Sequence, residues 1–285
     1  MNRVQFTKVQ GLGNDFLIIE VADINQLDTP GELAERFCQR NYGAGADGIV
    51  FVARSTDGRA DFASRIFNAD GSEPEISGNG TRCAVAFLYF RERWHEKAIR
   101  ISTVAGIKYG SLVSREGTHF EFEFAMGEPK LRSSDIPLVL DPPLPEVINF
   151  SLKMGGDIQN ITCVSMGNPH CTTFWHSLDG VDIDELGSLL EYHPAFPMRT
   201  NVEFAHIISR DEIEVLFWER GVGRTLSSGT GSCGASVAAM LNGFTERQIT
   251  VHTAGGKLRV HWRDDNIVLL TGSAEVIYEG LWLQE

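Results

Sequence analysis

An internal repeat is the feature that most constrains this chain of 285 residues, because two copies of one unit must build the same local structure. VQGLGND at 9–15 resembles VSMGNPH at 164–170, and SGNG at 77–80 resembles SGTG at 228–231. The pair IRISTVAGIKYGSLV (99–113) and ITVHTAGGKLRVHW (249–262) also matches. The matches keep the same order and a similar spacing along the chain. We therefore predict a duplicated α/β unit.

Each copy contains a glycine-rich turn that leads into a stretch of small and apolar residues, AVAFLYF in the first copy and ASVAAML in the second. Serine is a favoured N-cap residue, so the two turns predict helices that begin just after Ser77 and Ser228. Short segments rich in β-branched and aromatic residues, such as FLIIEV (16–21) and GIVFVA (48–53), predict strands. We expect each copy to form a β-barrel-like sheet around a central helix.

Two further segments have helical patterns. TPGELAERFCQRN at 29–41 predicts a helix with Thr29 as its N-cap and Pro30 in the first position. VDIDELGSLLEYHP at 181–194 predicts another that ends before Pro194.

The repeat also predicts the domain organisation. An N-terminal domain covers 1–127 and is completed by a C-terminal strand at 275–285, and the second domain covers 147–274. Residues 128–146, EPKLRSSDIPLVLDPPLPE, hold five prolines and are expected to form a linker. Two such domains that face each other would leave a cleft between them, and each would offer one helix N-terminus to that active-site cleft.

Composition excludes several classes of partner. The net charge of −13 without a basic run argues against nucleic acid and against an anionic membrane. No apolar run reaches the roughly 18 residues that a bilayer span requires, and the N-terminus lacks the apolar segment of a signal peptide. The five cysteines are an odd number without metal-type pairing, so we interpret them as reduced thiols of a cytoplasmic protein.

Two helix N-termini aimed at one pocket would hold a carboxylate and stabilise an enolate-like carbanion, because each end carries about half a positive charge and free N–H donors. A titratable group on each side of the same carbon could remove a proton from one face and return one to the other. This is the geometry of a racemase or epimerase. We find no dinucleotide, Walker or HExxH motif, and we expect no cofactor. A metal site at His170 is not expected, because no second ligand lies at metal spacing.

Eight segments together resemble the diaminopimelate epimerase family, in order over nearly the whole chain. They are GLGNDF (11–16), GAGADGI (43–49), RIFNADGSE (65–73), SGNGTRC (77–83), VSMGNPHC (164–171), RTNVEF (199–204), WERGVG (218–223) and SGTGSC (228–233). The resemblance implies a two-domain fold that isomerises LL- to meso-diaminopimelate without a cofactor, on the way to lysine and peptidoglycan. It also implies a homodimer that takes a small amino-acid substrate.

The same resemblance assigns site residues by motif position. Ser77 and Ser228 stand at the acid–base positions, where the family has cysteines, and Glu219 and Arg220 match the family's acid–base pair beside the substrate. We count Ser77, Ser228, Glu219 and His170 as the catalytic set, with His170 as the residue that holds its loop. The substrate contacts implied are Asn14, Asn68, Gly78, Asn79, Asn168, Asn201, Glu219, Arg220, Gly229 and Thr230.

The two serines are a departure with a large energetic consequence. A thiol titrates near 8.5, whereas an alcohol lies near water, at about 15.7. The gap of roughly 7 units corresponds to about 10 kcal/mol, and a helix N-terminus supplies up to about 2 kcal/mol. The helix alone therefore cannot make a serine equivalent to a thiolate.

Four interpretations remain open. The serines could be activated by neighbours such as Glu219, His170 or Asp70 and relay protons to them. The pocket could instead serve a related isomerase or dehydratase in which a carboxylate such as Glu219 is the base. The protein could be a non-catalytic amino-acid-binding pseudoenzyme whose serines are N-caps, or the serines could be engineered from cysteines. Arg224, where the family usually has Glu, favours natural divergence over engineering.

Overall fold

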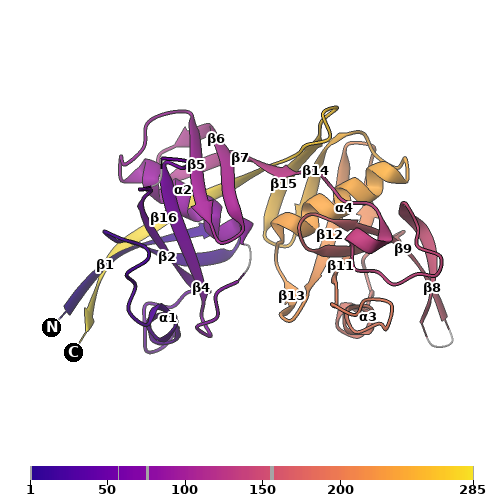
Figure 1. Ribbon diagram of the computed structural model, residues 1–285, viewed down its shortest axis with the longest axis horizontal. Helices are drawn as coiled ribbons and strands as arrows, with labels where there is room; N and C mark the ends of the chain where they lie inside the picture. The colour runs from indigo at the N-terminus through magenta and orange to yellow at the C-terminus, as the bar shows by residue number, and fades with distance from the viewer. Residues whose placement is uncertain (1, 57, 75–76, 155–156, 285) are drawn as a thin grey trace. The chain divides into compact units, whose positions relative to one another are not determined.

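The structure is a computed structural model that describes residues 2–56, 58–74, 77–154 and 157–284 (Figure 1). It divides into two compact units, Met1–Phe124 with Gly272–Glu285, and Ala125–Thr271. Residues 128–146, which we expected to form a linker, lie within the second unit, and Ile136 and Leu138 belong to its hydrophobic core.

The first unit is a sheet wrapped around one helix. Its elements are β1 (Asn2–Gly11), β2 (Asn14–Glu20), α1 (Pro30–Phe37), β3 (Gly48–Arg54), β4 (Phe62–Asn68), α2 (Gly78–Phe90), β5 (Ala98–Thr103), β6 (Gly106–Glu116) and β7 (His119–Gly127). The strands pair in the order β1 to β7, and β16 (Val268–Gln284) follows β7 and also pairs with β1. This second pairing closes the sheet into a barrel.

The second unit repeats the plan. Its elements are a short 3-10 helix (Ser133–Asp135), β8 (Val147–Met154), β9 (Asp157–Ser165), β10 (Pro169–Trp175), α3 (Ile183–Glu191), β11 (Asn201–Ile207), β12 (Glu212–Glu219), β13 (Gly223–Thr225), α4 (Gly229–Leu241), β14 (Gln248–Thr253), β15 (Gly256–Trp262) and the first residues of β16. The strand order is β8-β9-β10-β11-β12-β14-β15-β16, and β13 pairs with β12.

Strand directions support the duplication that the sequence predicts. In the first unit, β1–β2 is antiparallel, β2–β3 parallel, β3–β4 antiparallel, β4–β5 parallel and β5–β6 antiparallel. In the second unit, β9–β10, β10–β11, β11–β12, β12–β14 and β14–β15 follow the same alternation. The helices α1 and α3 fill one parallel crossover of each unit, and α2 and α4 fill the other.

The central helices are buried over almost their whole length, from Asn79 to Tyr89 in α2 and from Gly229 to Ala239 in α4. Small residues let the sheet approach closely. An added Cβ at Gly234 would lie 2.8 Å from Cβ and Cγ of His170 on β10. The predicted central helices are therefore present, and each begins directly after its serine.

The two outer helices are shorter than predicted. The helix expected at 29–41 ends at Phe37, and Pro30 is its first residue as expected. Thr29 is the N-cap residue as predicted, but its φ is 39° and its side chain makes no capping hydrogen bond. A capping side chain requires an extended N-cap backbone. The helix expected at 181–194 spans Ile183–Glu191 and is capped by Asp182.

Within the part of the chain that the structure describes, no helix combines the length and apolar character needed to cross a membrane.

Candidate active site

Ser77 and Ser228 occupy the same position at the start of the two central helices. Each has an extended backbone and accepts a hydrogen bond from the backbone N–H three residues on, Gly80 at 3.1 Å and Gly231 at 3.3 Å. The hydroxyl of the residue four positions on, Thr81 or Ser232, donates to the serine carbonyl. Both serines are therefore N-caps, and their oxygens lie at the positive ends of the helices.

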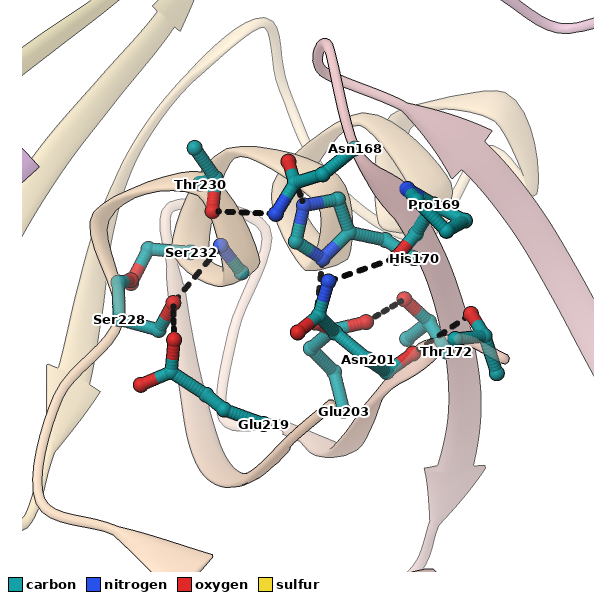
Figure 2. Close-up of polar contacts among 12 residues, drawn as sticks. Asn168, Pro169, His170, Thr172, Asn201, Glu203, Glu219, Ser228, Thr230 and Ser232 are labelled. Carbon is teal, nitrogen blue, oxygen red and sulfur yellow. Dashed lines mark hydrogen bonds and ion pairs between the residues drawn. The ribbon is translucent and has the colours of Figure 1, made fainter. Parts of the chain in front are cut away.

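Ser228 has a second partner, which is a carboxylate. Its hydroxyl donates to Glu219 Oε2 at 3.3 Å (Figure 2). Thr225 Oγ1 donates to the other carboxylate oxygen, Glu219 Oε1, at 2.7 Å. Glu219 is the last residue of β12, directly before the turn that leads to β13, and α4 follows β13. Burial raises the pKa of Glu219, and the hydrogen bonds from Thr225 and Ser228 offset part of the increase. A carboxyl group with a raised pKa is suited to accept and return protons near neutral pH.

A buried network connects β10 and β11 to the start of α4. His170 Nδ1 lies 2.6 Å from Glu203 Oε1, and His170 Nε2 lies 2.9 Å from Asn168 Oδ1 (Figure 2). The Asn168 amide donates to Thr230 Oγ1 at 3.4 Å. Burial raises the pKa of Glu203, and His170 opposes this increase. Both ring nitrogens of His170 are thus engaged by protein groups, and the residue orients Asn168.

Asn201 uses its whole carboxamide within the protein. The amide donates to the Pro169 carbonyl at 2.8 Å, and Oδ1 accepts the backbone N–H of Arg220 at 3.0 Å. The side chain is buried. Asn201 therefore connects the start of β10 to the turn that carries Arg220. The Arg220 guanidinium donates to the Met198 carbonyl.

The first unit holds a chain of side-chain hydrogen bonds at the start of α2. Asn14 donates to Asp47 at 2.8 Å and accepts from Asn79 at 3.4 Å. The fully buried Arg82 donates to Asn79 Oδ1 at 2.7 Å and to the Ser273 carbonyl at 2.8 Å. The two predicted contacts Asn14 and Asn79 are therefore adjacent and held in fixed orientations.

Asn68 ends β4 as Glu219 ends β12, so the repeat places an amide where the second unit has an acid. Asn68 donates to Ser72 Oγ at 3.0 Å. Asp70 accepts from the hydroxyl and the backbone N–H of Ser72, and these bonds lower its pKa. A lowered pKa makes Asp70 a weaker base than Glu219.

Gly78 and Gly229 are the first helical residues of α2 and α4, and an added Cβ at Gly78 would meet no atom of the described residues within 4 Å. The second unit thus holds two hydrogen-bonded sets at the start of α4, one of Ser228 with Glu219 and one of His170 with Asn168 and Thr230. The sequence motifs indicated no role for four supporting residues, which are Glu191, Glu203, Thr225 and Arg82. Glu203 lay inside the quoted motif RTNVEF, but nothing in the motif indicated which way its side chain points. Among the described residues, no group of three or more His, Cys, Asp or Glu is placed to hold a metal ion.

Comparison with known proteins gives consistent matches over most of the chain. Residues 6–132 and 162–277 match the family model described as diaminopimelate epimerase. A diaminopimelate epimerase of Pelotomaculum thermopropionicum is 44% identical over 97% of this chain and 98% of its own length. One of Cyanothece is 43% identical over 98% of this chain and 99% of its own length. A crystal structure of a probable proline racemase from Agrobacterium radiobacter shares the fold with a TM-score of 0.70, at 14% identity over 99% of this chain and 93% of the other.

Proposed function

The chain belongs to the diaminopimelate epimerase family, and we propose that it interconverts LL- and meso-diaminopimelate by proton transfer at Cα, in the pathway to lysine and peptidoglycan. The names of its relatives, at 43–44% identity over nearly their full length, support this substrate and an isomerase activity. Neither proton transfer in the proposed mechanism requires a cofactor. In the same proposal, the protein is a cytoplasmic homodimer, and sedimentation of the purified chain tests its assembly.

The observation that carries the proposal is the hydrogen bond from Ser228 to Glu219. Direct formation of an alkoxide is disfavoured by about 10 kcal/mol relative to a thiolate. Concerted transfer avoids this intermediate: as Ser228 Oγ takes the proton from Cα, its own proton passes to Glu219. The carboxylate becomes a neutral acid, and the electron pair of the broken C–H bond remains on the substrate as an enolate-like carbanion. The raised pKa of Glu219 supports it as the final proton acceptor.

Ser77 is assigned the second proton in this proposal, because it holds the duplicated position at the start of α2. It would donate its proton to the opposite face of Cα while solvent water relays a replacement proton to its oxygen, since Ser77 is partly exposed. Glu219 would release the proton it gained to solvent, so neither an alkoxide nor an extra proton remains. In the reverse direction the two serines would exchange roles. The N–H groups of the Gly78–Asn79 and Gly229–Thr230 turns are suited to hold carboxylates at the two helix starts. Arg220 would bind a carboxylate in bidentate fashion. Because both serines would flank one Cα, both turns would serve the carboxylate on that carbon, and Arg220 would bind the carboxylate at the other end of the substrate.

The decisive experiment follows LL-diaminopimelate in D2O by proton NMR. We expect the unmodified protein to remove the Cα–H signal and to produce the meso isomer. The Glu219→Gln variant should do neither at a comparable rate, and the Ser77→Cys, Ser228→Cys double variant should be faster than the unmodified chain.

Other outcomes identify the alternatives. Exchange of Cα–H without formation of the meso isomer would indicate one-sided chemistry with Glu219 as the base. No exchange by the unmodified protein but exchange by the double cysteine variant would indicate an intact pocket without epimerase chemistry. No exchange by either protein would refute the proposed function.

A further inference from the structure

Glu191 is a buried carboxylate at the end of α3 that lies outside every motif of the proposed site. Its side chain is 2% exposed. Oε2 accepts the indole N–H of Trp218 at 2.7 Å, and Oε1 accepts the backbone N–H of Gly221 at 2.9 Å. These two donors flank Glu219 and Arg220 in the sequence. One carboxylate therefore binds the chain on both sides of the proposed acid–base and carboxylate-binding residues.

Helix α3 is fitted against Trp218 at a second point. A Cβ added to Gly187 would lie 2.6 Å from Cγ of Trp218, so only glycine allows this approach. Gly187 and Glu191 are four residues apart and therefore share one face of the helix. Contact at both positions fixes α3 relative to the end of β12, where Glu219 lies.

The turn itself is held by two side chains from other elements. Asn201 Oδ1 accepts the N–H of Arg220 at 3.0 Å, and Glu191 Oε1 accepts the next N–H, that of Gly221. Satisfying both donors in a partly buried turn leaves the backbone little freedom. The direction of the Glu219 side chain follows from this backbone.

In the first unit, Gly31 and Glu35 of α1 lie against Gly71 in the turn after β4. Among the described residues, however, no hydrogen bond joins Glu35 to that turn, and Phe67, the duplicated counterpart of Trp218, has no side-chain N–H to donate. The position that corresponds to Glu219 is Asn68. The carboxylate clamp thus occurs in the unit that carries the acid.

We infer that Glu191 is a positioning residue for the reaction, which holds Glu219 within hydrogen-bond reach of Ser228 and sets the orientation of Arg220. Its effect on turnover rests on the proposed function. Its effect on the geometry of Glu219 does not.

A rescue experiment tests the clamp. Glu191→Gln leaves one oxygen for two N–H donors, so the new NH2 group must face either the Trp218 indole or the Gly221 N–H. The change also removes the charge that faces Arg199 Nη1 at 3.7 Å, and this ion pair contributes little because the Arg199 side chain is half exposed. Trp218→Phe removes the indole donor, and in that background the introduced glutamine can accept from Gly221 without a donor opposite its NH2 group. The matched control is Glu185→Gln, which makes the same chemical change at an exposed position of the same helix.

We expect Glu191→Gln to lower kcat/KM about 10- to 100-fold, as small misplacements of catalytic groups do. The double variant should differ from Trp218→Phe by about twofold or less, and the control should match the unmodified protein. All assays run well below the melting temperature of each variant. The inference is overturned if Glu191→Gln keeps the kcat/KM of the unmodified protein. It is also overturned if the fold-loss of kcat/KM in the double variant equals the two single fold-losses multiplied together.

A second readout needs no substrate. In a Ser228→Cys background, the pH profile of thiol alkylation reports how close the Glu219 carboxylate lies, because a neighbouring negative charge disfavours the thiolate. Glu191→Gln should shift this profile, and adding Trp218→Phe should restore it. An unchanged profile overturns the inference. If the unmodified protein catalyses no exchange, the proposed function fails, while the alkylation profile still decides the role of Glu191.

Discussion

Ser228 Oγ donates to Glu219 Oε2 at 3.3 Å while it accepts the N–H of Gly231 at the same distance. The hydroxyl is therefore oriented from both sides. Its proton points to a carboxylate whose pKa is raised by burial, and its oxygen lies at the positive end of α4. This arrangement lets a serine occupy an acid–base position, because the carboxylate holds the proton that the alcohol cannot give up alone.

Ser228→Ala should remove both functions of the side chain. Loss of the N-cap lowers the free energy of unfolding by about 1 kcal/mol, and loss of the proton relay lowers the exchange rate about 10²- to 10⁴-fold. Asp182→Ala removes an N-cap of the same kind from α3 and should cost similar stability while epimerisation continues. Urea unfolding and NMR exchange measure the two effects. Equal activity losses in both variants would mean that Ser228 serves only as a cap.

Glu219→Gln should change how stability depends on pH. Because the folded state raises the pKa of Glu219 above its ordinary value, it binds this proton more tightly than the unfolded state does. The contribution to stability is complete below the unfolded pKa and is lost as pH rises through the folded pKa. The Gln variant cannot lose this stability, because its side chain does not titrate. The difference in free energy of unfolding, variant minus unmodified chain, should therefore increase as pH rises from the unfolded pKa of Glu219 through its folded pKa. Parallel curves from urea titrations at several pH values would contradict the shift.

The repeat predicted the parts of the fold that depend on local sequence. Glycine-rich turns and serine caps are sufficient to locate α2 and α4, and the matched Thr-x-x-Gly segments form the same hydrogen bond in each unit. Thr103 donates to the Gly106 carbonyl at 2.8 Å, and Thr253 donates to the Gly256 carbonyl at 2.9 Å. Caps, tight turns and these Thr-x-x-Gly hydrogen bonds depend on only a few consecutive residues, so the sequence is enough to predict them.

The supporting carboxylates could not be predicted, because they depend on pairing between distant segments. His170 lies opposite Asn201 in the parallel pair β10–β11, and Thr172 lies opposite Glu203. The crossover through α3 sets this register, and the register places the Glu203 carboxylate within hydrogen-bond distance of His170. Likewise, Glu191 meets Trp218 only because Gly187 lets α3 approach β12.

Two glycines in the first turn of α2 should respond differently to alanine. At Gly80 a Cβ would lie 2.8 Å from Ile66 Cδ1 and 3.1 Å from Ser77 Oγ, so Gly80→Ala should lower stability by about 1–3 kcal/mol. At Gly78 an added Cβ meets none of the described atoms within 4 Å, so Gly78→Ala should be neutral or stabilising by up to about 1 kcal/mol. Its methyl group would nevertheless occupy the space that we assign to a substrate carboxylate. Calorimetry should therefore find weaker diaminopimelate binding in a fully folded Gly78→Ala protein, and unchanged affinity would remove Gly78 from the site.

The native cysteines should react slowly with thiol reagents. All five are buried and free, and burial raises the pKa of Cys38 and of Cys83 to about 12. Since the thiolate is the reactive form, the folded protein should show no rapid phase with a chromogenic disulfide, and all five thiols should react after unfolding in urea. Ser77→Cys should add one rapid equivalent, because Ser77 is partly exposed at a helix N-terminus that favours the thiolate. A rapid phase in the unmodified chain would show that a native thiol is accessible, and a candidate acid–base group other than the two serines would then have to be considered.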